Sequence, residues 1–350
     1  MITLFASDAR LQYTKDVFSV LALPRGSSFQ FRYESRYIEP NAKELLKEGK
    51  IDNLKAIVAF KSTFQADRTK SFCVPIRFVT IVSVSCTADV YKINYVVDGY
   101  PSVSSDYRVN SFSDINKYAV EIFDKFEQKD YTVCYDMLPK IELADQVETD
   151  DKDWREICRM MSMIPEYKSY HFIKCSLPYI NTLNDAGSGE KKYLSKKGIY
   201  YKFVENKCIN IDVDYYAEQY DPNKVTGIEV VIDEKILGKT KGLKTTFLSR
   251  YGTKKVGFQT LKTPNNSISE IVINATSTND NEIDTELIYP IIICKEQGSI
   301  VLRVVLAAVG ALFISLPGII KDILPLHFSI LSAVLGIILV GITNLIAAKE

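Results

Sequence analysis

The chain has 350 residues, of which 47% are hydrophobic and 25% are charged, and its 43 basic residues balance its 43 acidic ones. This length fits two domains, or one large domain with an appendage, and the composition is that of a globular protein. The charge balance argues against a basic duplex-binding surface or an acidic disordered tail as descriptions of the whole chain.

The predicted elements before residue 299 are mostly β-strands. Residues 1–16 lack a basic segment followed by an apolar core, so we expect no signal peptide there. Apolar and polar residues then alternate in many windows, which is typical of half-buried strands. Strands are predicted over 25–37, 54–61, 72–87, 90–97, 131–137, 168–177, 199–205, 209–215, 227–237, 243–250, 256–261, 270–275 and 286–294. Apolar residues at helical spacing predict helices over 41–48, 113–127 and 151–164.

Acidic residues gather at 141–153, and this stretch is the predicted linker between two β-rich modules, 1–140 and 154–298. The second module is expected to act as a sensor. The seven cysteines are an odd number, are scattered and form no CxxC pair. That pattern favours reduced thiols over a disulfide framework or a zinc site.

The strand over 25–37 is the main candidate for ligand binding, because aromatic residues alternate with arginines. Aromatic rings stack on bases and guanidinium groups hold phosphates, so a nucleotide or single-stranded oligonucleotide would suit it. The alternative is a sheet with an aromatic core face and a solvated basic face. Two lysine clusters add further candidates. The candidate ligand-binding residues are Arg25, Phe29, Phe31, Arg32, Tyr33, Arg36, Lys191, Lys192, Lys239 and Lys241.

Catalytic signals are weak. His171 is the only histidine before the apolar tail, and it lies in an alternating strand. Asp212 and Asp214 share a strand face, as metal-dependent nucleotidyl transfer requires, but a solvated outer face explains them better. No motif of a P-loop, a zinc protease or a serine hydrolase is present. We therefore predict no enzyme activity, no cofactor and no metal.

The tail from 299 to 350 is strongly apolar, with no charged residue in 304–320 or 328–348. About 20 apolar residues suffice to span a bilayer, so the tail predicts a transmembrane hairpin with spans at about 300–320 and 328–348. Two buried core helices are the alternative. The flanking basic residues favour a multi-pass protein of the inner membrane, with the N-terminal region and C-terminus cytoplasmic.

Polar and small residues in this tail leave two functions open, a pore built from several copies or a plain anchor. Ionisable groups at membrane depth tend to face a water path, and small residues let helices approach closely. The candidate pore residues are Arg303, Gly310, Ser315, Pro317, Gly336 and Asn344.

This layout, together with the LPRG and FQFRY stretches at 23–33, resembles the membrane effectors of bacterial antiphage defence systems, and in particular that of the Hailong system. The resemblance implies a tetrameric ion channel that is held closed by short DNA oligomers from a partner nucleotidyltransferase. The sequence thus predicts an α+β fold, with a β-rich cytosolic region of two modules before the hairpin. The expected function is a ligand-gated membrane effector with the lipid bilayer and its own copies as partners. A tail-anchored scaffold and a membrane-bound nucleotidyl-processing enzyme are the alternatives.

Overall fold

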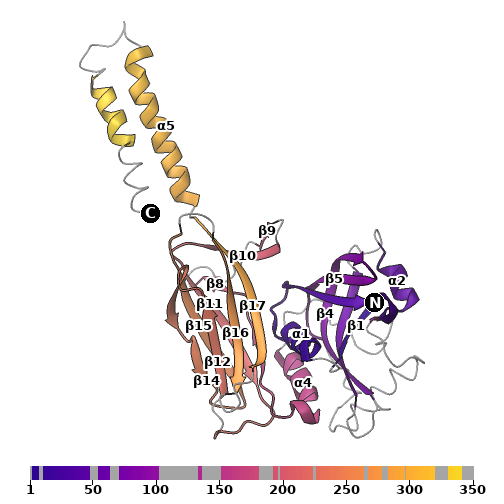
Figure 1. The fold of residues 1–350 in the computed structure, drawn as a ribbon. Helices are drawn as coiled ribbons and strands as arrows, with labels where there is room; N and C mark the ends of the chain where they lie inside the picture. The colour runs from indigo at the N-terminus through magenta and orange to yellow at the C-terminus, as the bar shows by residue number, and fades with distance from the viewer. Residues whose placement is uncertain are drawn as a thin grey trace.

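The protein is known from a computed structural model, shown in Figure 1. It describes residues 2–7, 11–47, 54–63, 71–101, 133–135, 151–180, 192–195, 198–223, 226–263, 267–277, 283–295, 297–319 and 330–340.

The elements of this part of the chain are mostly strands. The helices are α1 (Leu11–Ala22), α2 (Pro40–Leu45), α4 (Asp151–Ser162) and α5 (Gln297–Ile319), with short 3-10 turns η1 (Ser35–Tyr37) and η2 (Pro165–Tyr167). The strands are β1 (Ile2–Ser7), β2 (Ser28–Glu34), β3 (Leu54–Thr63), β4 (Ser71–Thr87), β5 (Val90–Val97), β6 (Val133–Tyr135), β7 (Phe172–Cys175), β8 (Tyr179–Ile180), β9 (Lys192–Ser195), β10 (Gly198–Val204), β11 (Cys208–Tyr216), β12 (Thr226–Ile232), β13 (Leu237–Lys241), β14 (Lys244–Thr246), β15 (Tyr251–Thr260), β16 (Ser267–Ser277) and β17 (Ile283–Cys294).

The N-terminal module is a mixed sheet in the order β2-β5-β4-β3-β1-β6. Its strands pair antiparallel except for β1 and β3, which run parallel. The parallel pair needs a long crossover, and the chain between its strands includes α1. Side chains alternate along β2, so that Phe31 and Tyr33 are buried while Arg32 and Glu34 are exposed.

The second module is a β-sandwich. One sheet has the order β14-β12-β16-β17-β10-β9, and the other has the order β13-β15-β11-β7, with β8 also paired to β11. Alternation again supplies the core, because Ile211 and Val213 of β11 and Ile271 and Ile273 of β16 are fully buried.

Helix α1 lies between the two modules (Figure 1) and contacts β1, β3 and β4 on one side and β7 and β17 on the other. The hydroxyls of Ser27 and Tyr201 also share a 2.7 Å hydrogen bond across this boundary. The buried side chains of both modules accordingly form one continuous hydrophobic cluster.

The predicted transmembrane hairpin is wrong, and so the fold class that included it is wrong as well. Within the described part of the chain, no helix combines the length and the apolarity that crossing a membrane requires. In the second apolar stretch, residues 330–340 are described as helix. The same finding contradicts the predicted multi-pass location in the inner membrane with both ends cytoplasmic. It also contradicts the predicted pore and channel.

The two C-terminal helical segments nevertheless lie side by side and extend away from the sandwich (Figure 1). They meet at glycines, since an added Cβ at Gly336 would lie 2.7 Å from the Gly310 carbonyl oxygen. The Ser332 hydroxyl donates a 2.7 Å hydrogen bond to the Phe313 carbonyl. We call α5 and residues 330–340 the helix pair.

Candidate functional site

Helix α1 joins the two modules through an aromatic cluster around Phe18. The ring centre of Phe18 lies 4.4 Å from that of Tyr170, 5.2 Å from that of Tyr167 and 5.6 Å from that of Phe172. These three residues precede or belong to the sandwich. On the other side, the Phe60 ring of β3 is 6.3 Å away. Phe18 therefore packs against both modules.

Arg77 of β4 is fully buried beneath the C-terminal end of α1. Its Nη1 donates to the Leu21 carbonyl at 3.4 Å and its Nε donates to the Asp98 carbonyl at 2.7 Å. The guanidinium lies 3.7 Å from the centre of the Tyr100 ring, whose hydroxyl donates to the same Leu21 carbonyl at 2.8 Å. The last carbonyls of a helix lack intrahelical partners and carry partial negative charge, so the end of α1 is a favourable place for a buried cation.

These contacts leave part of the guanidinium unsatisfied. The Arg77 Nη2 is buried and has no hydrogen-bond partner, and no ion pair with a carboxylate is found for Arg77 among the described residues. Burial lowers the pKa of Arg77, which the neighbouring Tyr100 partly opposes. A buried charge without an ionic partner is costly, so this arrangement calls for a compensating group.

Helix α4 packs on β4 and brings a second unsatisfied donor. Its buried face carries Trp154, Ile157, Cys158 and Met161 at helical spacing, and the Trp154 Nε1 also lacks a hydrogen-bond partner. Burial raises the pKa of the Cys158 thiol, so this thiol remains protonated. Arg77 and Trp154 thus lie on two elements that contact each other, and we call these two residues with β4 and α4 the junction layer.

Lys174 of β7 lies beside the junction layer. It is nearly buried, with its Nζ 5.4 Å from the centre of the Trp154 ring and 3.3 Å from a carboxylate oxygen of Asp214. The cation beside the Trp154 ring is therefore half of an ion pair with Asp214.

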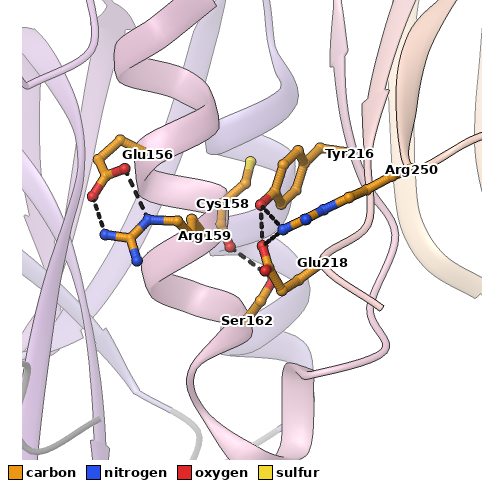
Figure 2. A network of polar contacts seen from close by, with 7 residues as sticks. All are labelled: Glu156, Cys158, Arg159, Ser162, Tyr216, Glu218 and Arg250. Atoms are coloured by element: carbon orange, nitrogen blue, oxygen red, sulfur yellow. Dashed lines mark hydrogen bonds and ion pairs between the residues drawn. The ribbon is translucent and has the colours of Figure 1, made fainter. Parts of the chain in front are cut away.

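A polar network covers the other side of α4 (Figure 2). Within α4, Arg159 Nε donates to Glu156 at 2.9 Å, while on the sandwich Glu218 accepts from Arg250 and from the Tyr216 hydroxyl. Arg250 Nη2 also donates to the Tyr216 hydroxyl at 3.1 Å. We call these five residues the outer network.

The protonation states in the outer network follow from these bonds. Burial, reinforced by the hydrogen bond to Glu218, raises the pKa of Tyr216 to about 12. Burial alone would raise the pKa of Glu218, but hydrogen bonds from Tyr216 and Arg250 outweigh it and lower that pKa. The hydrogen bond to Glu218 raises the pKa of Arg250. The network therefore holds a carboxylate against an arginine and a neutral tyrosine, which suits structural cohesion more than proton transfer.

The structure separates the aromatic and basic residues of the predicted ligand strand. Phe31 and Tyr33 are buried, and the Phe31 ring lies 5.3 Å from the ring of Tyr95. Phe29 is half-buried. The buried rings are not available to stack on bases, as the alternative of an aromatic core face predicts.

The arginines near this strand are all exposed. Arg36 pairs with Glu34 at 2.9 Å, and its guanidinium lies 4.7 Å from the centre of the Tyr37 ring. Arg32 Nε donates to the Gln30 side chain at 3.2 Å, and Arg25 follows the end of α1. They offer positive charge without an aromatic platform.

The other predicted residues are not brought to this strand. Lys192 lies in β9, and Lys239 and Lys241 lie in β13, but the positions of their side chains are not described, and Lys191 lies outside the described residues. In the helix pair, Gly310 and Gly336 are buried at the contact. The Ser315 hydroxyl donates to the Leu312 carbonyl at 3.0 Å. Arg303 and Pro317 belong to α5, with side chains that are not described, and Asn344 lies outside the described part.

The candidate catalytic residues all have structural contacts. The Tyr179 hydroxyl donates to Asp212 at 3.0 Å, and Thr253 donates to Asp214 at 2.6 Å. His171 is buried and stacks on Phe247 with ring centres 5.6 Å apart. Across the residues that the structure describes, no group of side chains is arranged to hold a metal ion.

Comparison with known proteins adds little to this geometry. No family model matches the chain, and no curated protein matches it. One solved structure with some likeness is that of a Niemann-Pick type C2 protein from Japanese carpenter ant. The likeness covers 32% of this chain and 98% of that one, at 13% identity and a TM-score of 0.18. So low a score supports no argument about fold or function.

Proposed function

We propose that this protein is a self-associating binding protein, in which the helix pair assembles copies of the chain and the two β-rich modules carry the ligand site. The exposure of the helix pair carries this proposal. Ten of its Val, Leu and Ile side chains keep between 42% and 64% of their surface accessible. Monomers rarely expose an apolar patch of more than a few hundred Å², and such patches mark sites of association.

The size of this surface is sufficient for association. Full burial of a Val, Leu or Ile side chain contributes about 1.5–3 kcal/mol, so covering the exposed halves of ten contributes roughly 10 kcal/mol before the cost of association. Residues 304–319 and 330–340 contain no charge, and exposed positions occur on several sides of both segments.

Other copies of the chain suit this surface as partners. A single partner would have to surround two uncharged helices, whereas symmetric copies can cover one another with the same faces, as in a helical bundle. The contact at Gly310 and Gly336 already brings the two segments of one chain together, so each copy would contribute a preformed pair.

The test is sedimentation velocity of the full chain in buffer, beside a double variant, Leu331→Glu with Ile337→Glu. These side chains are 57% and 64% exposed, so the change leaves the core intact. The unaltered chain is expected to sediment as an oligomer and the double variant as a single chain. Val231→Glu, at a 52% exposed position on β12, is the matched control and should remain oligomeric.

Three outcomes would overturn the proposal. They are a single-chain mass for the unaltered protein, an unchanged oligomer in the double variant, and flotation with phosphatidylcholine liposomes without self-association. The last would show that lipid covers the helix pair.

The predicted ligand remains a nucleotide or a short single-stranded DNA, made by a partner nucleotidyltransferase. A role in phage defence and the lack of enzyme activity also remain predictions. The exposed Arg25, Arg32 and Arg36 support an anionic ligand. Because Phe31 and Tyr33 are buried, such binding would depend mainly on charge.

Salt titration tests this ligand assignment. Binding of a fluorescent single-stranded oligonucleotide should fall with salt at a log-log slope of about 0.7 for each phosphate neutralised. Replacing Arg32 and Arg36 together by alanine should lower both the affinity and the slope. An unchanged slope would remove these arginines from the site.

A further inference from the structure

We propose that the junction layer is a receptor for a small oxyanion of the phosphate class, with Arg77 and Trp154 as its donors. This site differs from the exposed Arg25, Arg32 and Arg36 in and around β2, and the proposal does not depend on assembly through the helix pair.

Arg77 has a buried hydrogen-bond donor without an acceptor. A guanidinium offers five N–H donors and no acceptor. Nε and Nη1 are satisfied by the Asp98 and Leu21 carbonyls, whereas Nη2 has no partner. Nearly all buried polar atoms in proteins are hydrogen-bonded, and an exception indicates an absent water, an absent ion or a functional role.

The missing acceptor for Arg77 should carry negative charge. Carbonyl oxygens and the Tyr100 ring surround the guanidinium, but within the described chain none of its hydrogen bonds reaches a carboxylate. The Asp98 carboxylate acts on Arg77 only through space, because it accepts hydrogen bonds from Lys55 and Thr80. A water would satisfy the N–H groups without neutralising the charge. An oxyanion does both, and arginine forms paired hydrogen bonds with phosphate.

The indole N–H of Trp154 is the second unsatisfied donor. Trp154 is buried on α4, which packs on β4, and its Nε1 is unsatisfied too. An indole N–H can only donate. Two unsatisfied donors on elements in contact favour a negatively charged acceptor and exclude a cation. The Lys174 ammonium near the indole ring is already paired with Asp214.

The junction layer is closed in this structure, since Arg77 is fully buried and Trp154 nearly so. An oxyanion therefore enters when α4 separates from β4, or is enclosed as the modules fold together. Once bound, it links β4 to α4 and holds the N-terminal module against the segment that leads into the sandwich.

The test is the thermal unfolding of the full chain in inorganic phosphate and in sodium chloride of equal ionic strength. A ligand that binds only the folded state raises the melting temperature with the logarithm of its concentration. We expect phosphate to raise it more than chloride does, and sulfate to behave like phosphate. A nucleoside monophosphate distinguishes a free anion from a larger ligand, because a site that accepts only free phosphate will not respond to it.

Three variants locate the effect. Arg77→Met should abolish the excess shift, and Trp154→Phe, which keeps the ring and loses the N–H, should reduce it. The exposed Arg36→Met is the matched control and should retain it. If Arg77→Met does not fold, Trp154→Phe still decides. An equal shift in phosphate and chloride, or a full shift in Trp154→Phe, would overturn the proposal.

Discussion

Replacing Asp16 by asparagine is expected to stabilise the protein near neutral pH and to have little effect below pH 3.8, where the carboxyl is protonated in the folded and the unfolded state. Asp16 is half-buried on α1, and burial raises the pKa of its carboxyl from 3.8 to about 6, with Arg32 acting in the opposite direction. The folded protein thus holds this proton more tightly than the unfolded chain does. The stabilisation is fully present below pH 3.8 and is lost as the pH rises through about 6.

The size of the effect follows from this shift. A change from 3.8 to about 6 sets an upper bound of about 3 kcal/mol, at roughly 1.4 kcal/mol for each pH unit. Because the carboxyl is only half-buried, water screens it, and a loss on the order of 1 kcal/mol is the realistic figure. Asp16→Asn removes this loss, which corresponds to a melting temperature higher by about 2 °C.

The assay is thermal unfolding followed by far-UV circular dichroism at about pH 8 and at about pH 3, below the pKa of the unfolded carboxyl. The Asp16→Asn variant should melt above the unaltered protein at the higher pH and together with it at the lower pH. Asp89→Asn, in the exposed turn between β4 and β5, is the control and should show no such pH dependence. An equal difference at both pH values, or destabilisation at the higher one, would refute the reasoning.

Three further substitutions test other contacts by thermal unfolding. Gly336→Val should destabilise the helix pair by about 1–3 kcal/mol, because its Cβ would lie 2.7 Å from the Gly310 carbonyl oxygen. Glu218→Gln should cost on the order of 1 kcal/mol, because the ion pair with Arg250 is lost from a partly exposed site. Phe18→Ala should cost about 3–5 kcal/mol, because it empties the centre of the cluster between the modules.

Each of these three substitutions has a result that would contradict the expectation, and two of them have a matched control variant. Gly99→Ala places a Cβ where no atom lies within 4 Å and should be tolerated, so equal losses at both glycines would discount the helix contact. A Glu218→Gln variant as stable as the parent would show that the outer network contributes nothing net. Leu11→Ala alters an exposed residue of α1 and should be nearly neutral, because alanine is the best helix former. A loss as large as that of Phe18→Ala would show that the cost does not come from packing in the aromatic cluster.

Alternation in the sequence predicted much of the sheet structure, because most strands have one buried and one solvated face. β3, β4 and β5 begin and end within two residues of the predicted ranges. The helix over 151–164 is confirmed as α4, and that over 41–48 as the shorter α2. The helix over 113–127 lies outside the described residues.

Helix α1 was not predicted, although its sequence carries part of an amphipathic stripe. Thr14, Val17, Phe18 and Leu21 are buried at the i, i+3, i+4, i+7 spacing of such a helix. Val20 and Ala22 are buried as well, because the helix is covered on two sides, and this widens the apolar arc beyond the usual pattern.

The strand predicted over 25–37 shows a different limit of prediction from sequence. The same alternation fits both an exposed stacking surface and a core face, and only the packing of Phe31 and Tyr33 inside the N-terminal module decides between them. The apolar tail shows a third limit. Its hydropathy predicted membrane spans, whereas no helix in the described part of the chain has the length and the apolarity that a span requires.

The junction layer had one sequence signal that was not used. Arg77 is the single charged residue in the apolar run of β4 from Val74 to Ile81, and such a residue is either at an edge or buried with a purpose. Its partners could not be inferred, because Leu21 and Asp98 lie 56 and 21 positions away. Trp154 fitted a helical stripe and was correctly placed on a buried face, but its lack of an acceptor is visible only in three dimensions.

The same geometry explains how one module can influence the other. A helix of 12 residues is marginal in water by itself, so α1 depends on the surfaces that enclose it. Its Leu21 carbonyl is bound by Arg77 and Tyr100 of the N-terminal module, and one turn earlier Phe18 packs on Phe172 of the sandwich. A change that moves the Arg77 guanidinium therefore acts on the end of α1, and α1 transmits it to the aromatic cluster. By contrast, the exposed face of β2 makes no such bridge within the described structure. A ligand bound there can affect the sandwich through the core of its own module or through the hydrogen bond between Ser27, just before β2, and Tyr201, whereas an anion in the junction layer would act on both modules directly.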